Sequence, residues 1–374
     1  MIDILFVNDI ANGGGTEKVL QEITANLSDD EYRVTVLTFM REKEFYKYYK
    51  ESIRYWYIYE EDMMPPKTFI KKCINNLKRR QRRLYIKHNI RKTNFDIAVA
   101  IKEGPVMKYV SNLSVPKKNA WIHTDFSVLH WSGECFKSGI GELECMRSFD
   151  KVVCVSQNVM KNVKKYVGDS GNIIVLENPI NEKAILEKSY EVQDLIIRDT
   201  KKLLFVTVGR LCREKGYDML IEACKMLNGI GYTDLYEVWI IGGGECGDEL
   251  RKQMTKSNIS NIIMLGQQTN PYKFLKSADW FISTSRAEGY AVAPQEAAVL
   301  GIPIIATDCS GVRELLGDSE YGIVTEINTQ AIYEAMQRVI TDKQCMTIYK
   351  DKIRKRSRSI RLDVRMDKIK QILR

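Results

Sequence analysis

The stretch that decides the fold is WFISTSRAEGYAVAPQEAAVLGIPIIATD, residues 280–308. It starts with a β-rich apolar run at 280–285, passes through a loop that contains a glycine, enters a helix near 293–294, and ends in a second β-rich run at 303–308. A strand, a helix and a strand in this order are typical of a parallel sheet covered by helices. We therefore expect an α/β fold.

The same alternation runs through both halves of the chain. Further β-rich runs lie at 3–8, 32–39, 95–101, 119–123, 151–156 and 172–180, and then at 202–209, 236–243 and 262–266. The 374 residues exceed what one hydrophobic core usually organises. We predict two doubly wound domains, 1–180 and 181–350, which meet near Asn178-Pro179-Ile180 and are joined by a charged connector up to Lys202. One or two terminal helices at 351–374 are expected to return to the N-terminal domain.

The composition of the chain predicts its cellular location, the state of its cysteines and the absence of a metal site. No run of eighteen apolar residues occurs, and the N-terminus MIDILFVNDI lacks the features of a signal peptide, so we expect a cytoplasmic protein. The nine cysteines include no CxxC pair, and several lie in apolar runs, which favours reduced and mostly buried thiols. Three scattered histidines make a histidine-rich metal site improbable, and we predict no metal.

A basic segment stands out in the first half. Between Lys67 and Lys92 there are eleven Lys or Arg residues and no Asp or Glu, and apolar residues recur at helical spacing. Such a helix could simply be solvated on its basic face. It could equally dock on the anionic inner leaflet of a membrane, where each basic residue contributes about 1 kcal/mol. No nucleic-acid-binding signature accompanies the segment, and we predict no nucleic-acid partner.

The chemistry of the chain concentrates in the stretch quoted first. Glu288 follows a strand, and open α/β sheets bind ligands at the carboxyl ends of their strands. Backbone N–H groups from Gly289 to Val292, at a helix N-terminus, would attract an anion such as a diphosphate. Glu288 and Glu296 could accept hydrogen bonds from sugar or ribose hydroxyls. The alternative is that Glu296 only caps or solvates its helix and that Glu288 is a loop charge.

This stretch resembles the two-glutamate motif of the retaining glycosyltransferases of family 4, which have the GT-B fold. The segment VGRLCREKGYDMLIEA, 208–223, is similar to the donor-phosphate motif of that family, and NGGGTEK, 12–18, is similar to its glycine loop. The resemblance implies two Rossmann-like domains facing across a cleft, an N-terminal one for the acceptor and a C-terminal one for a nucleotide sugar. It implies no metal and no cofactor. Uridine diphosphate is the commonest nucleotide in the family.

The resemblance also implies a role for individual residues. Glu296 would bind the ribose, and Glu288 the donor sugar. Arg210 and Lys215 would neutralise the diphosphate, whose charge grows as the glycosidic bond breaks. His123 would lie near the donor sugar, and Asp125 could orient the acceptor. The catalytic set is thus Glu288, His123, Arg210 and Lys215. The remaining donor-binding positions are Gly14, Gly15, Gly243, Gln267, Gly289, Tyr290, Ala291 and Val292.

The expected reaction is transfer of a hexose-type sugar to a glycan or glycolipid acceptor in surface polysaccharide assembly, at the inner face of the membrane. Retention could proceed through a covalent intermediate or by front-face attack, with the leaving diphosphate as base. We favour front-face attack because no carboxylate can be assigned as the nucleophile. Two other functions stay open: a sugar-nucleotide epimerase, which needs no acceptor, and a non-catalytic donor-binding subunit of a transferase complex.

Overall fold

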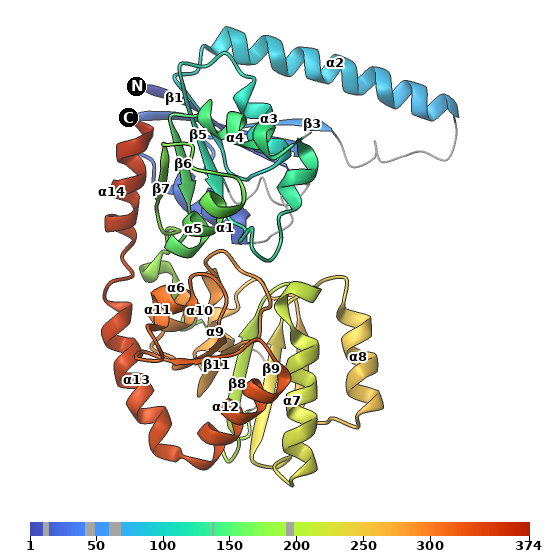
Figure 1. The fold of residues 1–374 in the computed structure, drawn as a ribbon, viewed down its shortest axis with the longest axis vertical. Coiled ribbons are helices and arrows are strands. Elements are labelled where there is room, and N and C mark those ends of the chain that lie inside the picture. The colour runs from blue at the N-terminus through green and yellow to red at the C-terminus, as the bar shows by residue number, and fades with distance from the viewer. Residues whose placement is uncertain (10–14, 42–48, 60–68, 137, 192–197) are drawn as a thin grey trace. The chain divides into compact units, whose positions relative to one another are not determined.

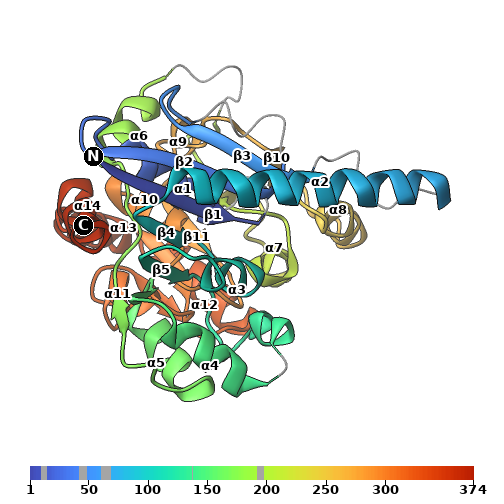
Figure 2. The same cartoon turned by 90° about the horizontal axis from the view of Figure 1, so that it is seen from above.

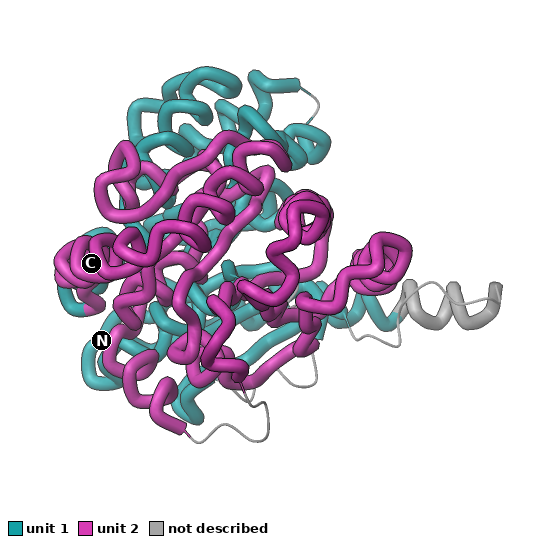
Figure 3. The backbone as a smooth tube through the Cα atoms, turned by 90° about the horizontal axis from the view of Figure 1, so that it is seen from below, with its two compact units in different colours: residues 1–179, 363–374 teal, residues 180–362 magenta. Residues whose placement is uncertain are grey.

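The computed structural model describes residues 1–9, 15–41, 49–59, 69–136, 138–191 and 198–374, with side chains of the long basic helix from Lys78 onward. The chain divides into two compact units (Figures 1 and 3). Unit 1 comprises Met1–Pro179 and Asp363–Arg374, and unit 2 comprises Ile180–Leu362. Each unit is built around a parallel sheet, so the predicted α/β class with two doubly wound domains is confirmed.

Unit 1 contains a parallel sheet whose described strands run in the order β3-β2-β1-β4-β5-β6-β7. The order reverses direction between β1 and β4, which lie side by side in the middle of the sheet. Its strands are β1 (Ile2–Asn8), β2 (Tyr32–Met40), β3 (Arg54–Tyr59), β4 (Ile97–Ala100), β5 (Lys117–Ile122), β6 (Lys151–Cys154) and β7 (Ile173–Val175). Its helices are α1 (Gly15–Ala25), α2 (Phe69–Thr93), α3 (Pro105–Ser111), the 3₁₀ turn η3 (Trp131–Cys135), α4 (Gly139–Arg147), α5 (Gln157–Tyr166) and α14 (Leu362–Leu373).

Unit 2 repeats the architecture with the strand order β10-β9-β8-β11-β12-β13. Here the order reverses between β8 and β11. The strands are β8 (Leu203–Val208), β9 (Tyr236–Ile241), β10 (Ile262–Gly266), β11 (Trp280–Ser283), β12 (Ile304–Thr307) and β13 (Ile323–Thr325). The helices are α6 (Glu182–Ser189), the 3₁₀ turn η4 (Arg213–Lys215), α7 (Tyr217–Gly229), α8 (Gly247–Lys256), α9 (Tyr272–Leu275), α10 (Val292–Val299), α11 (Val312–Leu316), α12 (Thr329–Thr341) and α13 (Lys343–Ser357).

The apolar runs seen in the sequence form the cores of both units. Ile4, Leu5, Phe6 and Val7 of β1 are fully buried, as are most residues of β4, β6, β8 and β12. Strands buried on both faces read as continuous apolar runs, because helices cover the sheet from both sides. In unit 2, α7 packs against α8 and α12, whereas α10 packs against α6 and α13 (Figure 1).

Three elements differ from the sequence-based prediction. β3 and β13 were not expected, and both are edge strands. Neither has a long apolar run: β3 is mostly partly exposed, and β13 has only three residues. The expected connector up to Lys202 also contains a helix, α6, whose first turn is capped by Asn181 accepting from the N–H of Ala184 at 3.0 Å.

The C-terminal region divides at a different point from the predicted 350/351. α13 belongs to unit 2, where Cys345, Tyr349 and Ile353 are buried. The residues that group with unit 1 begin at Asp363, and α14 is fixed there by Asn119, whose amide donates to the carbonyl of Ile372 at 2.9 Å. The helical pattern was visible in the sequence, but the packing partner of each helix was not.

Candidate functional site

The reversal of strand order in unit 2 brings predicted residues from distant parts of the sequence together. Arg210 and Lys215 follow β8, and Glu288 follows β11, which is the neighbouring strand. Because all strands of this sheet are parallel, these loops leave the same edge. Lys215, Ser285 and Glu288 line one recess there, together with residues of the α10 N-terminus.

The loop after β8 is held tightly against the end of β11. Gly216 adopts a φ of 64°, and a Cβ at this position would lie 2.1 Å from the carbonyl oxygen of Thr284. The Thr284 hydroxyl donates in turn to the carbonyl of Lys215 at 3.1 Å. Only glycine permits this left-handed conformation and close approach at low cost. The side chain of Lys215 is thereby fixed next to the loop that carries Glu288.

Lys215 and Glu288 form an ion pair in the recess. The Lys215 ammonium donates to Glu288 Oε1, and the two side chains are 27% and 14% exposed. Burial by itself would lower the pKa of Lys215, but the Glu288 carboxylate raises it above its ordinary value. Lys215 is therefore cationic at neutral pH, and its ion pair with Glu288 compensates that charge.

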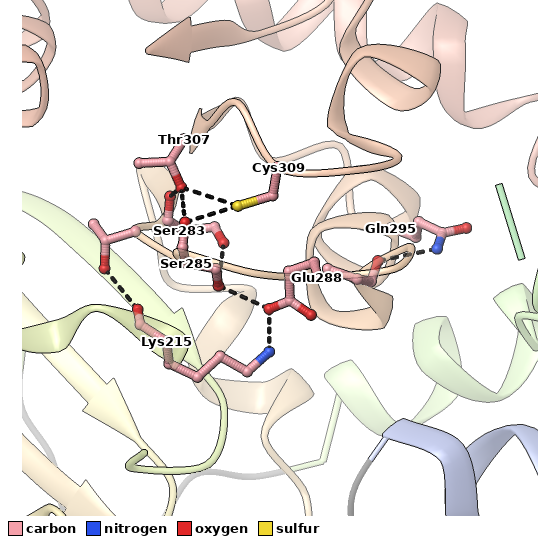
Figure 4. A network of polar contacts seen from close by, with 9 residues as sticks. Lys215, Ser283, Ser285, Glu288, Gln295, Thr307 and Cys309 are labelled. Atoms are coloured by element: carbon pink, nitrogen blue, oxygen red, sulfur yellow. Dashed lines mark hydrogen bonds and ion pairs between the residues drawn. The ribbon is translucent and has the colours of Figure 1, made fainter. Parts of the chain in front are cut away.

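Glu288 Oε1 accepts a second hydrogen bond, from the Ser285 hydroxyl at 2.7 Å. Figure 4 shows that this serine is anchored in turn by β12 and the loop after it: its carbonyl oxygen accepts from Thr307 Oγ1 at 2.6 Å and from Cys309 Sγ at 2.8 Å. Burial raises the pKa of the Cys309 thiol to about 12. The thiol therefore stays protonated and serves as a donor.

The second glutamate of the motif lies deeper. Glu296 is in α10, is 3% exposed, and accepts from the Tyr272 hydroxyl at 2.8 Å. Gly289, Tyr290 and Ala291 precede the helix and Val292 is its first residue, so their backbone lies at the helix N-terminus as predicted from the sequence. Tyr290 is buried, with 5% exposure. The contact with Tyr272 was not foreseen, because α9 is only four residues long.

The loops after β9 and β10 adjoin the loop after β8. The Leu211 N–H donates to the carbonyl of Gly243 at 2.9 Å, which places Gly243 beside exposed Arg210. Gly242 has a φ of 149°, and a Cβ there would lie 1.9 Å from the Gly209 carbonyl oxygen. Gly243 also lies next to Gln267, since a Cβ on Gly243 would be 3.3 Å from Gln267 Oε1. The predicted donor-binding residues of unit 2 thus all lie at the side of its sheet where the carboxyl ends of the strands meet.

In unit 1, His123 lies directly after β5 and beside a buried carboxylate that the sequence did not reveal. Glu103 is fully buried; its Oε2 accepts from the His123 backbone N–H at 3.0 Å, and its Oε1 accepts from Trp131 Nε1 at 3.1 Å and from the Thr124 hydroxyl. Burial lowers the pKa of His123 to about 4, although Glu103 acts in the opposite direction. The imidazole is therefore neutral at pH 7, and no described residue hydrogen-bonds to its buried Nε2.

Asp125 and the glycine loop are the other predicted site positions in unit 1. Asp125 Oδ1 accepts from the backbone N–H and hydroxyl of Ser127 and from the Asn162 amide, each at 2.8 Å. These contacts give Asp125 a local structural role that its sequence position did not show. Gly15 is the first residue of α1 and is exposed. Gly14 and Lys67 lie outside the described residues.

The eight cysteines whose side chains are described are all free, and five of them are buried. Within the described residues, no three His, Cys, Asp or Glu side chains come together as metal ligands would. Among the described helices, none combines the length and apolar composition needed to cross a bilayer.

Two parallel-sheet units, one of them with a polar site where its strand order reverses, define the GT-B class. HepE from Anabaena, solved with UDP and glucose, has the same fold: the TM-score is 0.80 at 16% sequence identity, over 100% of this chain and 99% of that one. Two family models match the sequence, Glycosyltransferase Family 4 over residues 13–184 and Glycosyl transferases group 1 over residues 191–359. The chain belongs to this glycosyltransferase family, and the resemblance noted in the sequence is confirmed.

Two curated relatives carry specific names. One, from Campylobacter jejuni, is named N-acetylgalactosamine-N,N'-diacetylbacillosaminyl-diphospho-undecaprenol 4-alpha-N-acetylgalactosaminyltransferase and is 30% identical over 53% of this chain and 53% of its own length. The other, from Escherichia coli, is named UDP-Gal:alpha-D-GlcNAc-diphosphoundecaprenol alpha-1,3-galactosyltransferase and is 26% identical over 62% of this chain and 59% of its own. The chain thus spans little more than half the length of each.

Proposed function

We propose that this protein is a retaining, metal-independent hexosyltransferase that moves a sugar from a UDP-sugar to a lipid-linked glycan in surface polysaccharide assembly. The proposal rests mainly on the charged residues that lie together where the strand order of unit 2 reverses. There, two cationic side chains, Arg210 and Lys215, lie on a loop beside Glu288, and Glu296 lies in the helix that follows. Cations suit a diphosphate, and carboxylates suit hydroxyl groups.

The reaction assigns each of these groups a task. The bond between the anomeric carbon and the diphosphate oxygen breaks, and a bond to an acceptor hydroxyl forms on the same face. The hydroxyl proton passes to the departing diphosphate. Arg210 and Lys215 stabilise the negative charge that gathers on that diphosphate. Glu288 binds the sugar hydroxyls, and Glu296 binds the ribose. No bound metal is required, because the two cations supply the positive charge.

The acceptor is inferred from two independent features. Both relatives described above have names that place their acceptor sugars on a diphospho-undecaprenol lipid. In this chain, α2 packs along β3 (Figure 2). Arg82 of α2 donates to the Tyr57 carbonyl at 3.0 Å and lies over the Tyr57 ring. Leu84 and Tyr85 on α2 are 60% and 54% exposed among basic residues. This combination suits an anionic membrane surface.

A panel of labelled UDP-sugars with and without undecaprenyl-diphosphate-linked glycans tests the proposal. We expect one donor to give slow hydrolysis alone, fast transfer when the acceptor is present, and unchanged rates in a chelator. Proton NMR of the product should show the anomeric configuration of the donor. Conversion to an isomeric UDP-sugar without acceptor would indicate an epimerase instead. Binding without any turnover would indicate a non-catalytic subunit.

A further inference from the structure

Ser285 contacts the carboxylate on which the proposed reaction depends. It is the second residue after β11 and is 2% exposed. Its hydroxyl and the Lys215 ammonium both donate to Oε1 of Glu288 (Figure 4). Among the described residues, none donates to the other oxygen, Oε2. One oxygen of this carboxylate is therefore held by the protein, and the other is left for a ligand.

The anchoring of Ser285 does not depend on the ligand. Thr307 and Cys309 donate to its carbonyl oxygen at 2.6 and 2.8 Å, and both are buried, with 1% and 7% exposure. These two donors belong to β12 and the loop after it. The backbone of Ser285 is thereby tied to the neighbouring strand, and its hydroxyl is presented to Glu288 from a rigid support.

The two groups that donate to Oε1 differ in how strongly each can bind the diphosphate of a nucleotide. Lys215 is cationic, and a diphosphate is a stronger partner for it than a single carboxylate. Ser285 is neutral and has no such alternative. When Lys215 turns to the diphosphate, the serine is the donor that remains on Glu288.

We propose that Ser285 is a positioning residue, which keeps Glu288 oriented with Oε2 toward the donor sugar after Lys215 has engaged the diphosphate. This inference rests on the proposed function, since it requires Glu288 to act on the sugar. It also goes beyond the proposed function, because it assigns Ser285 a role that acts through Glu288.

The first test compares Ser285→Ala with the parent chain. We expect kcat for the accepted UDP-sugar to fall about 10- to 100-fold, as for loss of a hydrogen bond to a charged group. The Kd for UDP, measured by calorimetry, should stay within about twofold of the parent value, because UDP lacks the sugar whose hydroxyls Glu288 binds. The matched control is Ser189→Ala, another buried serine of unit 2, whose hydroxyl donates to the Leu186 carbonyl at 2.7 Å. It should leave both values unchanged.

The second test is a double-mutant cycle with Glu288→Gln. If Ser285 acts through the carboxylate, adding Ser285→Ala to Glu288→Gln should lower kcat by less than about twofold further. A merely structural serine would give the same factor in both backgrounds, and that additive result would overturn the proposal. A parent-like kcat in Ser285→Ala, or an equal loss of UDP affinity, would overturn it as well.

A folding control and the activity of the parent chain separate failure of the positioning role from failure of the proposed function. Thermal melting checks the fold of each variant, and Ser285→Cys, similar in size but a weak donor, replaces the alanine variant if that one unfolds; it too must lower kcat while UDP binding persists. If the parent chain turned over no UDP-sugar at all, the proposed function would fail, and the positioning role with it. An active parent with an unaffected serine variant would contradict the positioning role alone.

Discussion

At the scale of single residues, the pairing of Lys215 with Glu288 makes the expected effect of removing Glu288 unusual. Glu288→Gln abolishes the negative charge that competes with a diphosphate for Lys215. At an effective dielectric constant near 20, charges about 6 to 8 Å apart interact by roughly 2 kcal/mol, and salt reduces this. We expect UDP to bind about 3- to 10-fold more tightly by calorimetry, while transfer from a UDP-sugar falls at least about 100-fold.

The control for this prediction is Asp234→Asn, which changes the net charge by the same amount. Asp234 pairs with Lys202 at 3.5 Å and its side chain is 95% exposed, so UDP affinity should not change. Weaker UDP binding by Glu288→Gln would mean that the glutamate supports the nucleotide site and does not compete for Lys215.

His123 gives a pH-dependent prediction. Its pKa in the folded chain is about 4, mainly because it is buried, and it is close to 6.5 when unfolded. Between these values the unfolded chain binds more protons, so the free energy of unfolding should fall as the pH drops from 6.5 to 4. In His123→Gln this part of the decrease should be absent. Urea unfolding at several pH values, compared between the two chains, measures the difference.

An independent check uses NMR of the histidine side chains. The signal that disappears in His123→Gln should titrate near pH 4 in the parent, since burial, together with the smaller effect of Lys102, outweighs the attraction of Glu103. A titration near pH 6.5 would show that the ring is solvated and would remove the basis for the stability prediction.

The sequence was informative about charged and glycine residues that follow strands, but it did not reveal the buried partners that hold them. Glu288, Arg210 and Lys215 follow the ends of strands, and Glu296 lies in the helix after Glu288, so the four form a recognisable spacing. Ser285, Tyr272 and Glu103 could not be found in this way. Their roles depend on which loops the sheet order brings together, and a buried hydroxyl or carboxylate has no local signature in one dimension.

At the scale of elements, α2 offers a test of membrane contact. Reversal of four exposed basic residues should weaken binding to phosphatidylserine vesicles at least about 100-fold, because each contributes about 1 kcal/mol. Sedimentation with vesicles measures this, and binding of the parent should fall with added salt. The four changes to Glu are at Lys78, Arg80, Lys87 and Arg91.

A matched reversal in unit 2 separates α2 from net charge alone. It replaces four exposed basic residues of α13 and its C-terminus by Glu, and it should reduce vesicle binding far less. Equal losses from both sets would leave α2 with no special role and would favour the solvated-face interpretation. The control positions are Lys343, Lys350, Lys355 and Arg358.

Element prediction succeeded where burial on both faces left a continuous apolar run. Most predicted strands appear within a few residues of their expected ends, for example β1, β2 and β8. β3 failed because RYWYIY lies at a sheet edge with partly exposed aromatic residues, whose packing comes from α2. β13 has three residues, too few to show any periodicity.

At the scale of the whole molecule, the chain begins in unit 1 and returns to it with its last helix. Arg365 in α14 is almost fully buried; it pairs with Glu177 at 2.5 Å and donates to the carbonyl of Asn178 at 2.7 Å. These residues lie just before the point where the chain leaves unit 1. The packing of α14 therefore closes unit 1 at both ends of its discontinuous sequence.

Arg365→Ala should destabilise unit 1 by about 2 to 3 kcal/mol, because hydrogen bonds made by a buried charge are lost and the Asn178 carbonyl loses a donor. Glu177 is 38% exposed and can be solvated, so the loss should stay below that of a fully buried pair. The control on the same helix is Arg374→Ala, whose pair with Glu31 is 61% and 52% exposed and should contribute far less, because solvent screens it. Urea unfolding of the full chain measures both. Since the diphosphate-binding residues belong to unit 2, UDP affinity should survive Arg365→Ala; a parallel loss of UDP binding would mean that the two units do not fold as separate bodies.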